Sequence, residues 1–206
     1  MHTRHLKLST VLRVTLLAIL FSAVFNRPGV SQSSPDGPYD VFLPLLTKPF
    51  LPLPAILNDD FELGNNGDWT VASSNDYYLI QNDHLPFTPH SGAWLAWMGG
   101  VPLEVSSISQ GVSLPSDSPV YLRYYYRVAS AKSSCNEDWM RLRVGAAVLV
   151  SLGLCVSGNT TGWVAGTVDL SAYVGQTITI EFEVTTNSDD STSAFFIDDV
   201  SLVRSP

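Results

Sequence analysis

The chain has 206 residues, of which 19 are acidic and 11 are basic, so its formal net charge at neutral pH is −8. An acidic surface repels the phosphate backbone, which argues against nucleic-acid binding. The sequence has no G-x-S-x-G or H-E-x-x-H motif and no Cys-x-x-Cys pair, so it indicates neither a common hydrolase nor a metalloprotease, and we expect a protein that is not an enzyme.

Residues 1–31 have the pattern of a secretory signal peptide. Arg4, Lys7 and Arg13 precede an apolar run of twelve residues at 14–25, which is too short for a bilayer span of about 20 residues. Its removal takes four of the eleven bases and none of the acids, which leaves a net charge of −12. We expect a secreted, extracellular protein with no membrane span in the mature chain; an uncleaved N-terminal anchor is the alternative.

Residues 32–57 are rich in proline. Prolines at positions 35, 38, 44, 49, 52 and 54 exclude a regular helix or a central strand. The segment is predicted to be an extended linker, or to wrap onto a neighbouring surface, because it also carries several apolar residues within 41–46.

Residues 58–206 have the pattern of one all-β domain. Apolar residues alternate in short runs bounded by Gly, Pro, Ser, Asn and Asp, and no window shows a helical period. Strands are predicted at 58–63, 68–73, 77–82, 92–98, 104–112, 119–129, 138–145, 147–155, 163–169, 176–185 and 194–203. Many short strands without helices predict a sandwich or a barrel.

Three of these strands can be phased by their apolar residues, because alternate side chains of a strand share a face. The core side takes Val120, Leu122, Tyr124, Tyr126 and Val128 in the first, Met140, Leu142 and Val144 in the second, and Ile178, Ile180, Phe182 and Val184 in the third. The outward side then carries Tyr121, Arg123, Tyr125, Arg127, Trp139, Arg141, Arg143, Glu181 and Glu183.

If the three strands share one sheet, this outward side forms a single face that suits a polysaccharide or glycoconjugate. Aromatic rings cover the apolar faces of a pyranose, and Arg and Glu side chains bond its hydroxyl groups. The alternative is that opposite charges on neighbouring strands pair with each other on a solvated face.

The last predicted strand, 194–203, carries two aspartates in its middle. Phe196, Asp198, Val200 and Leu202 share one face by alternation, so Asp198 is expected on the core side. A buried carboxylate needs a partner to offset its lost hydration. A β-bulge would exchange Asp198 and Asp199.

Four motifs stand out in the predicted domain. They are "NDDFELGNNGDW" at 58–69, "HSGAWLAWMGG" at 90–100, "TGWVAGTVDLSAYVGQTITIEFEV" at 161–184 and "AFFIDDVSLV" at 194–203. Together they resemble the galactose-binding-like jelly-roll superfamily, which includes carbohydrate-binding modules, MAM-type adhesion domains and accessory domains of secreted bacterial peptidases and glycosidases. The resemblance implies a jelly-roll β-sandwich of two antiparallel sheets.

The resemblance also implies a structural Ca²⁺ ion between the first and last strands. Its ligands would be Glu62 and Asp198, or Asp199 if a bulge reverses the phase, with backbone carbonyls near Asp60 and Ser91–Gly92. Calcium prefers such hard oxygen ligands. The alternative is that Asp198 accepts hydrogen bonds from the backbone or from hydroxyl groups and that no metal binds.

Loops hold weaker candidates of three kinds. They are a zinc site (Asp83, His84 and His90), a second cation site (Asp189 and Asp190) and a ligand-stacking tyrosine in the loop 73–84 (Tyr77 or Tyr78).

The two cysteines, Cys135 and Cys155, are predicted to form a disulfide. With a three-residue turn at 144–146, opposed residues of the two flanking strands have numbers that sum to 290, so Met140 faces Val150. Extending this ladder places Cys135 opposite Cys155, within reach of an S–S bond. A two-residue turn would shift the register, and two free thiols are the alternative.

These observations predict a secreted, non-catalytic jelly-roll module that binds a polysaccharide or glycoconjugate and holds a structural calcium ion. One alternative is an adhesion domain, of the MAM type, that binds a cell-surface protein. Another is an accessory domain of a secreted hydrolase system that carries no catalytic domain of its own.

Overall fold

The structure, a computed structural model, describes residues 49–190 and 192–206. The predicted signal peptide and the first part of the proline-rich segment lie outside these residues. Within the described ranges, no helix has both the length and the apolar character to cross a membrane.

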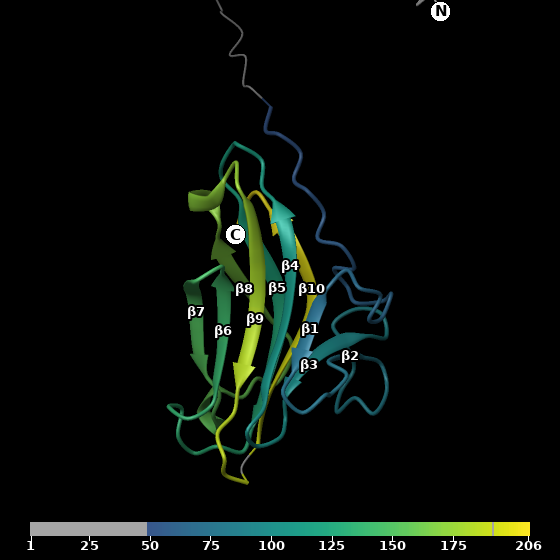
Figure 1. Ribbon diagram of the computed structural model, residues 1–206, viewed down its shortest axis with the longest axis vertical. Coiled ribbons are helices and arrows are strands. Elements are labelled where there is room, and N and C mark those ends of the chain that lie inside the picture. The colour runs from purple at the N-terminus through teal and green to yellow at the C-terminus, as the bar shows by residue number, and fades with distance from the viewer. Residues whose placement is uncertain (1–48, 191) are drawn as a thin grey trace, which may run out of the picture. The chain divides into compact units, whose positions relative to one another are not determined.

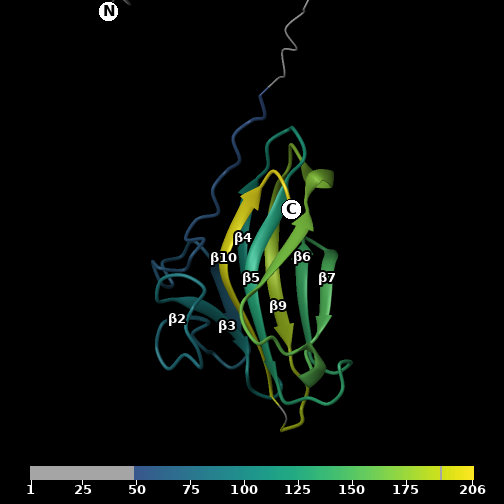
Figure 2. The same cartoon turned by 180° about the vertical axis from the view of Figure 1, so that it is seen from behind.

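Ten strands in the described residues form two antiparallel sheets that pack face to face (Figure 1). In chain order they are β1 (Thr70–Ser73), β2 (Ile80–Gln81), β3 (Leu95–Gly99), β4 (Val105–Ser113), β5 (Tyr121–Ser130), β6 (Trp139–Val144), β7 (Ala147–Gly153), β8 (Val164–Asp169), β9 (Thr177–Thr185) and β10 (Ser193–Val203). Short 3-10 helices follow β7 (η1, Val156–Gly158) and β8 (η2, Ser171–Tyr173). The first sheet has the order β1-β4-β9-β6-β7 and the second the order β2-β3-β10-β5-β8, which Figure 2 shows from behind. The predicted jelly-roll β-sandwich is confirmed.

The core lies between the two sheets and follows the predicted alternation. Leu122 of β5, Leu142 of β6 and Phe182 of β9 are completely buried. The rings of Tyr124 and Phe182 meet edge to face across the interface, with 5.0 Å between their centroids. The inward phases of these three strands are therefore confirmed, because strand alternation holds wherever the pairing is regular.

The prediction of a strand at 58–63 is wrong. This stretch is a tight turn in which Asn58 and Phe61 have positive φ angles of 48° and 60°. The Asn58 side chain closes the turn by donating to the Gly64 carbonyl at 2.9 Å and accepting from the Leu63 amide at 3.0 Å. Asparagine tolerates this left-handed region and bonds its own backbone, so the local turn chemistry outweighs the weak apolar alternation.

The described end of the proline-rich segment packs on the sandwich. The Leu57 backbone exchanges two hydrogen bonds with the Gln110 side chain, at 2.8 and 2.9 Å, and Ile56 is buried in the core. Further along, the Leu51 amide donates to Asp117 at 2.6 Å and its carbonyl accepts from Arg204. Residues 49–57 thus wrap along the domain.

The disulfide between Cys135 and Cys155 is present, with Cα atoms 4.8 Å apart, but the register used to predict it is wrong. The β6–β7 hairpin has a two-residue turn, since Val144 pairs with Ala147, and Leu142 faces Val150 after a bulge. Neither cysteine lies on the ladder. The chain leaves both strands first, and the bond forms between the two following loops.

Strand β10 changes phase at a bulge. Before the bulge Phe195 and Ile197 point into the core, and after it Val200 does, because Asp199 takes a positive φ of 46°. The predicted placement of Asp198 on the core side with Val200 is therefore wrong. Asp198 shares the outer face of the second sheet with Phe196, yet it is completely buried, because a loop covers it.

Candidate functional site

The charged and aromatic residues predicted to form one face lie on two faces. Strands β6 and β9 are neighbours in the first sheet, but β5 belongs to the second sheet. Their outward side chains therefore point to opposite sides of the sandwich, and the prediction of a single face is wrong. Trp139, Arg141, Arg143, Glu181 and Glu183 lie on the first sheet, and Tyr121, Arg123, Tyr125 and Arg127 lie on the second.

On the first sheet the charges pair with each other. Arg143 donates to Glu183 at 3.0 Å, and an Arg141 guanidinium nitrogen lies 3.5 Å from the same carboxylate. The Arg141 guanidinium also lies 5.7 Å from the centre of the Trp139 ring. This arrangement matches the charge ladder that was the alternative to ligand binding; a ligand role for this face stays a prediction.

On the second sheet a covering loop, residues 82–94, lies over the outward side chains. The His90 ring stacks on Tyr125 with 3.6 Å between centroids, and the Arg127 guanidinium lies 3.8 Å from the centre of the Phe87 ring. Phe87 in turn packs against Phe196 at 4.5 Å. Tyr125 and Arg127 are thus half-buried and hold the loop, and their predicted ligand role stays untested.

Three carboxylates fasten the end of the same loop. Asp198 accepts from the amides of His90 at 2.8 Å and Ser91 at 3.1 Å, while Asp199 accepts from the Ser91 hydroxyl at 2.8 Å and contacts the His90 ring. Glu62 accepts from the amides that follow Gly92, at 2.7 Å each. Burial raises the pKa of Asp198 to about 7, with the amides of Ser91 and His90 acting in the opposite direction.

The alternative to a metal ion was that Asp198 accepts hydrogen bonds from the protein, and the amides of His90 and Ser91 donate such bonds. Asp60 accepts from the Glu62 amide at 3.2 Å. Within residues 49–190 and 192–206 no three His, Cys, Asp or Glu side chains are grouped to hold a metal ion. Three of the predicted ligands, Glu62, Asp198 and Asp199, bond the same loop, and the ion itself stays a prediction.

The weaker cation candidates are engaged elsewhere. His84 lies against Asp83, 3.3 Å away on an exposed loop, whereas His90 lies against Asp199, so the structure does not bring the predicted zinc trio together. Asp189 pairs with Lys132, a fully buried lysine that also bonds Glu137 at 3.1 Å. Burial lowers the pKa of this ammonium, but the surrounding acids raise it above its usual value overall.

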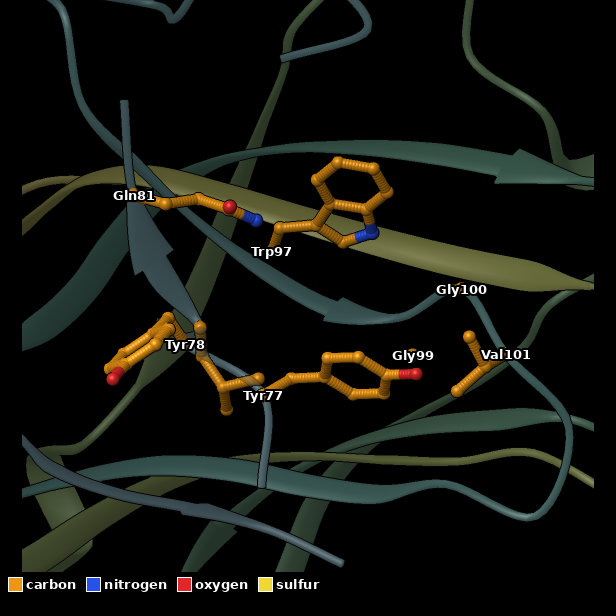
Figure 3. Close-up of a pocket in the computed structure, with 8 residues that line it drawn as sticks. Tyr77, Tyr78, Gln81, Trp97, Gly99, Gly100 and Val101 are labelled. Atoms are coloured by element: carbon orange, nitrogen blue, oxygen red, sulfur yellow. The ribbon is translucent and has the colours of Figure 1, made fainter. Parts of the chain in front are cut away.

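A pocket of about 410 Å³ opens at the edge of the second sheet, beside β2 and β3 (Figure 3). It is lined by Tyr77, Tyr78, Leu79, Gln81, Trp97, Gly99, Gly100 and Val101. Figure 3 shows the Tyr77 ring and the Trp97 indole opposite one another, with the Gln81 amide pointing toward Trp97. Tyr77 and Tyr78 are 51% and 82% exposed, which is unusual for aromatic side chains beside a hollow.

Strand β3 and the turn after it hold one wall. Trp97 packs on Phe196, with 5.1 Å between ring centroids, so its orientation is fixed from below. Gly99 and Gly100 have positive φ angles of 74° and 85°, and a Cβ on Gly100 would lie 3.1 Å from Trp97 Nε1. Glycine at these positions lets the turn pass close to the indole edge.

Glu104 holds the opposite wall. This completely buried carboxylate accepts from the hydroxyls of Ser73 and Ser74, at 2.6 and 3.1 Å, and from the Asn75 amide at 2.5 Å. The Ser73 hydroxyl then accepts from the Tyr77 backbone amide at 3.0 Å. The turn that carries the two tyrosines is therefore built on one buried anion.

The pocket keeps unused polar groups beside its aromatic rings. Trp97 Nε1 is buried without a hydrogen-bond partner, and the Gln81 side chain bonds no other residue in the described ranges. None of the lining side chains carries a charge. Aromatic surface beside the free Gln81 amide can hold a ligand that has an apolar face and hydroxyl groups.

Comparisons with known proteins bear on the fold. No protein-family profile matches the chain, and no curated protein matches it. Among solved structures, the carbohydrate-binding module TmCBM61, in complex with beta-1,4-galactotriose, matches with a TM-score of 0.53 and 18% identity over 72% of this chain and 97% of that chain. The K3 adhesin domain of Lys-gingipain from Porphyromonas gingivalis matches with a TM-score of 0.51 and 16% identity over 73% of this chain and 98% of that chain.

These two structures share the two-sheet β-sandwich fold of this chain. The resemblance drawn from the four motifs is thus confirmed at the level of the fold. A Stig cyclase from Fischerella sp. TAU matches with a TM-score of only 0.46 and 12% identity, over 75% of this chain and 99% of that chain.

Sequence reasoning identified only part of the pocket. The tyrosine pair was a candidate because two adjacent aromatic residues lie in a polar loop. Trp97 and Gln81 were not among the predicted site residues. The "MGG" that follows Trp97 is the signal that could have found this wall, because paired glycines next to an aromatic residue allow close backbone approach.

Proposed function

We propose that this protein is a secreted, non-catalytic carbohydrate-binding module, and that its ligand site is the pocket between Tyr77 and Trp97. The observation that carries the proposal is an aromatic pocket whose Gln81 amide bonds no other residue in the described ranges. Pyranose rings present apolar C–H faces for stacking and hydroxyl groups for such donors. The fold it shares with TmCBM61 supports the proposal.

The test is binding of soluble polysaccharides, measured by affinity electrophoresis and calorimetry. Tyr77→Ala and Trp97→Ala are expected to weaken binding at least tenfold, which corresponds to about 1.4 kcal/mol. Tyr78 is 82% exposed, so Tyr78→Ala is expected to have little effect on folding. It replaces Trp97→Ala as the test variant if Trp97→Ala does not fold. Trp139→Ala is the matched control, because it removes an indole from the outer face of the first sheet.

The control also tests the earlier prediction for that face. If Trp139→Ala abolishes binding and the pocket variants retain it, the site lies on the charge ladder and the pocket proposal is wrong. If the protein binds no polysaccharide of a broad plant and microbial panel, carbohydrate binding itself is wrong.

A structural calcium ion is part of the proposal. Glu62 and Asp198 or Asp199 would hold it, with backbone carbonyls near Asp60 and Ser91. Its support is that the buried Asp198 and the half-buried Glu62 and Asp199 bond the same loop, where a cation would offset the lost hydration of Asp198. The ion would fasten the covering loop and take no direct part in binding sugar.

A second candidate is binding of a cell-surface protein, as an adhesion domain. The exposed apolar side chains of Leu103 and Val105, 67% and 50% exposed, favour it, because both residues bond through their backbones to Ser74 in the tyrosine turn. Together with Tyr77 they extend the apolar surface beside the pocket. Leu103→Asp would abolish protein capture and leave polysaccharide binding unchanged.

A further inference from the structure

We infer that the pocket selects uncharged glycans and that Gln81 is the residue that recognises their hydroxyl pattern. This inference rests on the proposed function and names the ligand class and the specificity determinant of that same site. Three features of the pocket carry it: its lack of charge, the free amide of Gln81, and the rigid placement of that amide.

The lack of charge excludes acidic sugars. No Lys, Arg or His lines the pocket, so nothing there offsets the hydration that a uronate or sulfate group loses on entry. The chain has a net charge of −8, which repels polyanions at longer range. A neutral hexose or pentose residue has no charge to desolvate and is not repelled by the negative net charge of the chain.

The Gln81 amide has the groups that a pair of neighbouring hydroxyls requires. It offers two N–H donors and one carbonyl acceptor, and each sugar hydroxyl both donates and accepts. No residue in the described ranges uses these groups. Gln81 is also the one amide side chain among the lining residues, next to the ring of Trp97.

The backbone fixes where this amide is presented. Gln81 lies on β2, which pairs with β3 through Gln81 opposite Leu95 and Ile80 opposite Ala96. Trp97 lies two residues beyond Leu95 on the same paired strand. Strand pairing therefore fixes the backbone positions from which the ring and the amide reach the pocket, which is how a rigid element supports specificity.

The experiment compares Gln81→Leu with the parent protein on two panels of polysaccharides. Beta-1,4-galactan, xylan and mixed-linkage beta-glucan form the neutral panel, and polygalacturonate and alginate form the anionic panel. The parent is expected to bind at least one neutral polymer and neither anionic one. Gln81→Leu, which keeps the volume and removes the amide, is expected to weaken the neutral interaction about tenfold.

Gln176→Leu is the matched control, because Gln176 is exposed in the turn before β9, far along the chain from the pocket, and it should bind as the parent does. Thermal melting of all variants checks that they fold. Anionic polymers bound as tightly as neutral ones overturn the inference, as does parental binding by Gln81→Leu when Tyr77→Ala has lost it. If every pocket variant binds as the parent does, the proposed function itself is overturned.

Discussion

Glu104 accepts a hydrogen bond from the Ser73 hydroxyl at 2.6 Å, across 31 positions of the chain. The bond joins the residue before β4 to the end of β1, and Ser74 and Asn75 add two more donors from the same turn. Because this turn continues into Tyr77 and Tyr78, a residue with no contact to the pocket's interior sets the position of its tyrosine wall.

Replacement of Glu104 by Gln is expected to weaken both stability and glycan binding. The Gln amide nitrogen cannot accept from Ser74 or Asn75, so at least one donor loses its partner, at a cost of about 1–3 kcal/mol. Urea unfolding measures the first effect and polysaccharide affinity the second. Glu181→Gln, on the first sheet, is the matched control. Parental values for Glu104→Gln in both measurements would show that the turn does not depend on this anion.

The raised pKa of Asp198 predicts how stability depends on pH. The ordinary value of this group is 3.8, and burial raises the pKa in the folded protein to about 7. Between these values the folded state holds a proton that the unfolded state releases. The free energy of unfolding therefore falls as pH rises from about 4 to about 7, by up to about 1.4 kcal/mol per pH unit from this one group.

Denaturant unfolding in EDTA at several pH values, for the parent and for Asp198→Asn, isolates this contribution. The stability of the parent relative to the variant is expected to decline across the window, since only the parent has the titrating carboxyl. A difference that stays constant from pH 4 to pH 7 would mean that the amide donors of His90 and Ser91 outweigh burial.

Calcium is expected to raise the melting temperature. A ligand that binds only the folded state at a hundredfold excess over its Kd stabilises by about 2.7 kcal/mol. The measurement is thermal melting in millimolar calcium against EDTA, and Asp198→Asn or Asp199→Asn identifies which aspartate is the ligand. Identical melting curves, together with a native mass that lacks an ion, would leave the loop fastened by hydrogen bonds alone.

Loss of the disulfide is expected to destabilise the domain. Cys135 and Cys155 are separated by 20 positions, and closure of a loop of that length contributes about 3 kcal/mol. Cys135→Ser with Cys155→Ser should therefore shift the urea midpoint to a lower concentration. Addition of a reductant should shift the parent by a similar amount and leave the double variant unchanged. Equal midpoints for both proteins would show that the bond adds nothing to stability.

Several features could be predicted from the sequence because they depend on neighbouring residues alone. Strand alternation placed Leu122, Leu142 and Phe182 in the core correctly, since a regular strand sends every second side chain to one side. The disulfide partners were also predicted correctly, although the register was wrong. A two-residue turn and a bulge moved the ladder, and the loops beyond it brought the sulfur atoms together.

The tertiary structure alone decided which faces and pockets exist. Arg123 and Arg141 have similar surroundings in the sequence, yet they lie on opposite sides of the sandwich, because strand pairing between distant segments assigns each strand to its sheet. The pocket depends on the same kind of pairing: Gln81 meets the strand of Trp97 only because β2 joins the edge of the second sheet. Long-range pairing is selected by the packing of the whole core, so no local pattern in the chain carries it.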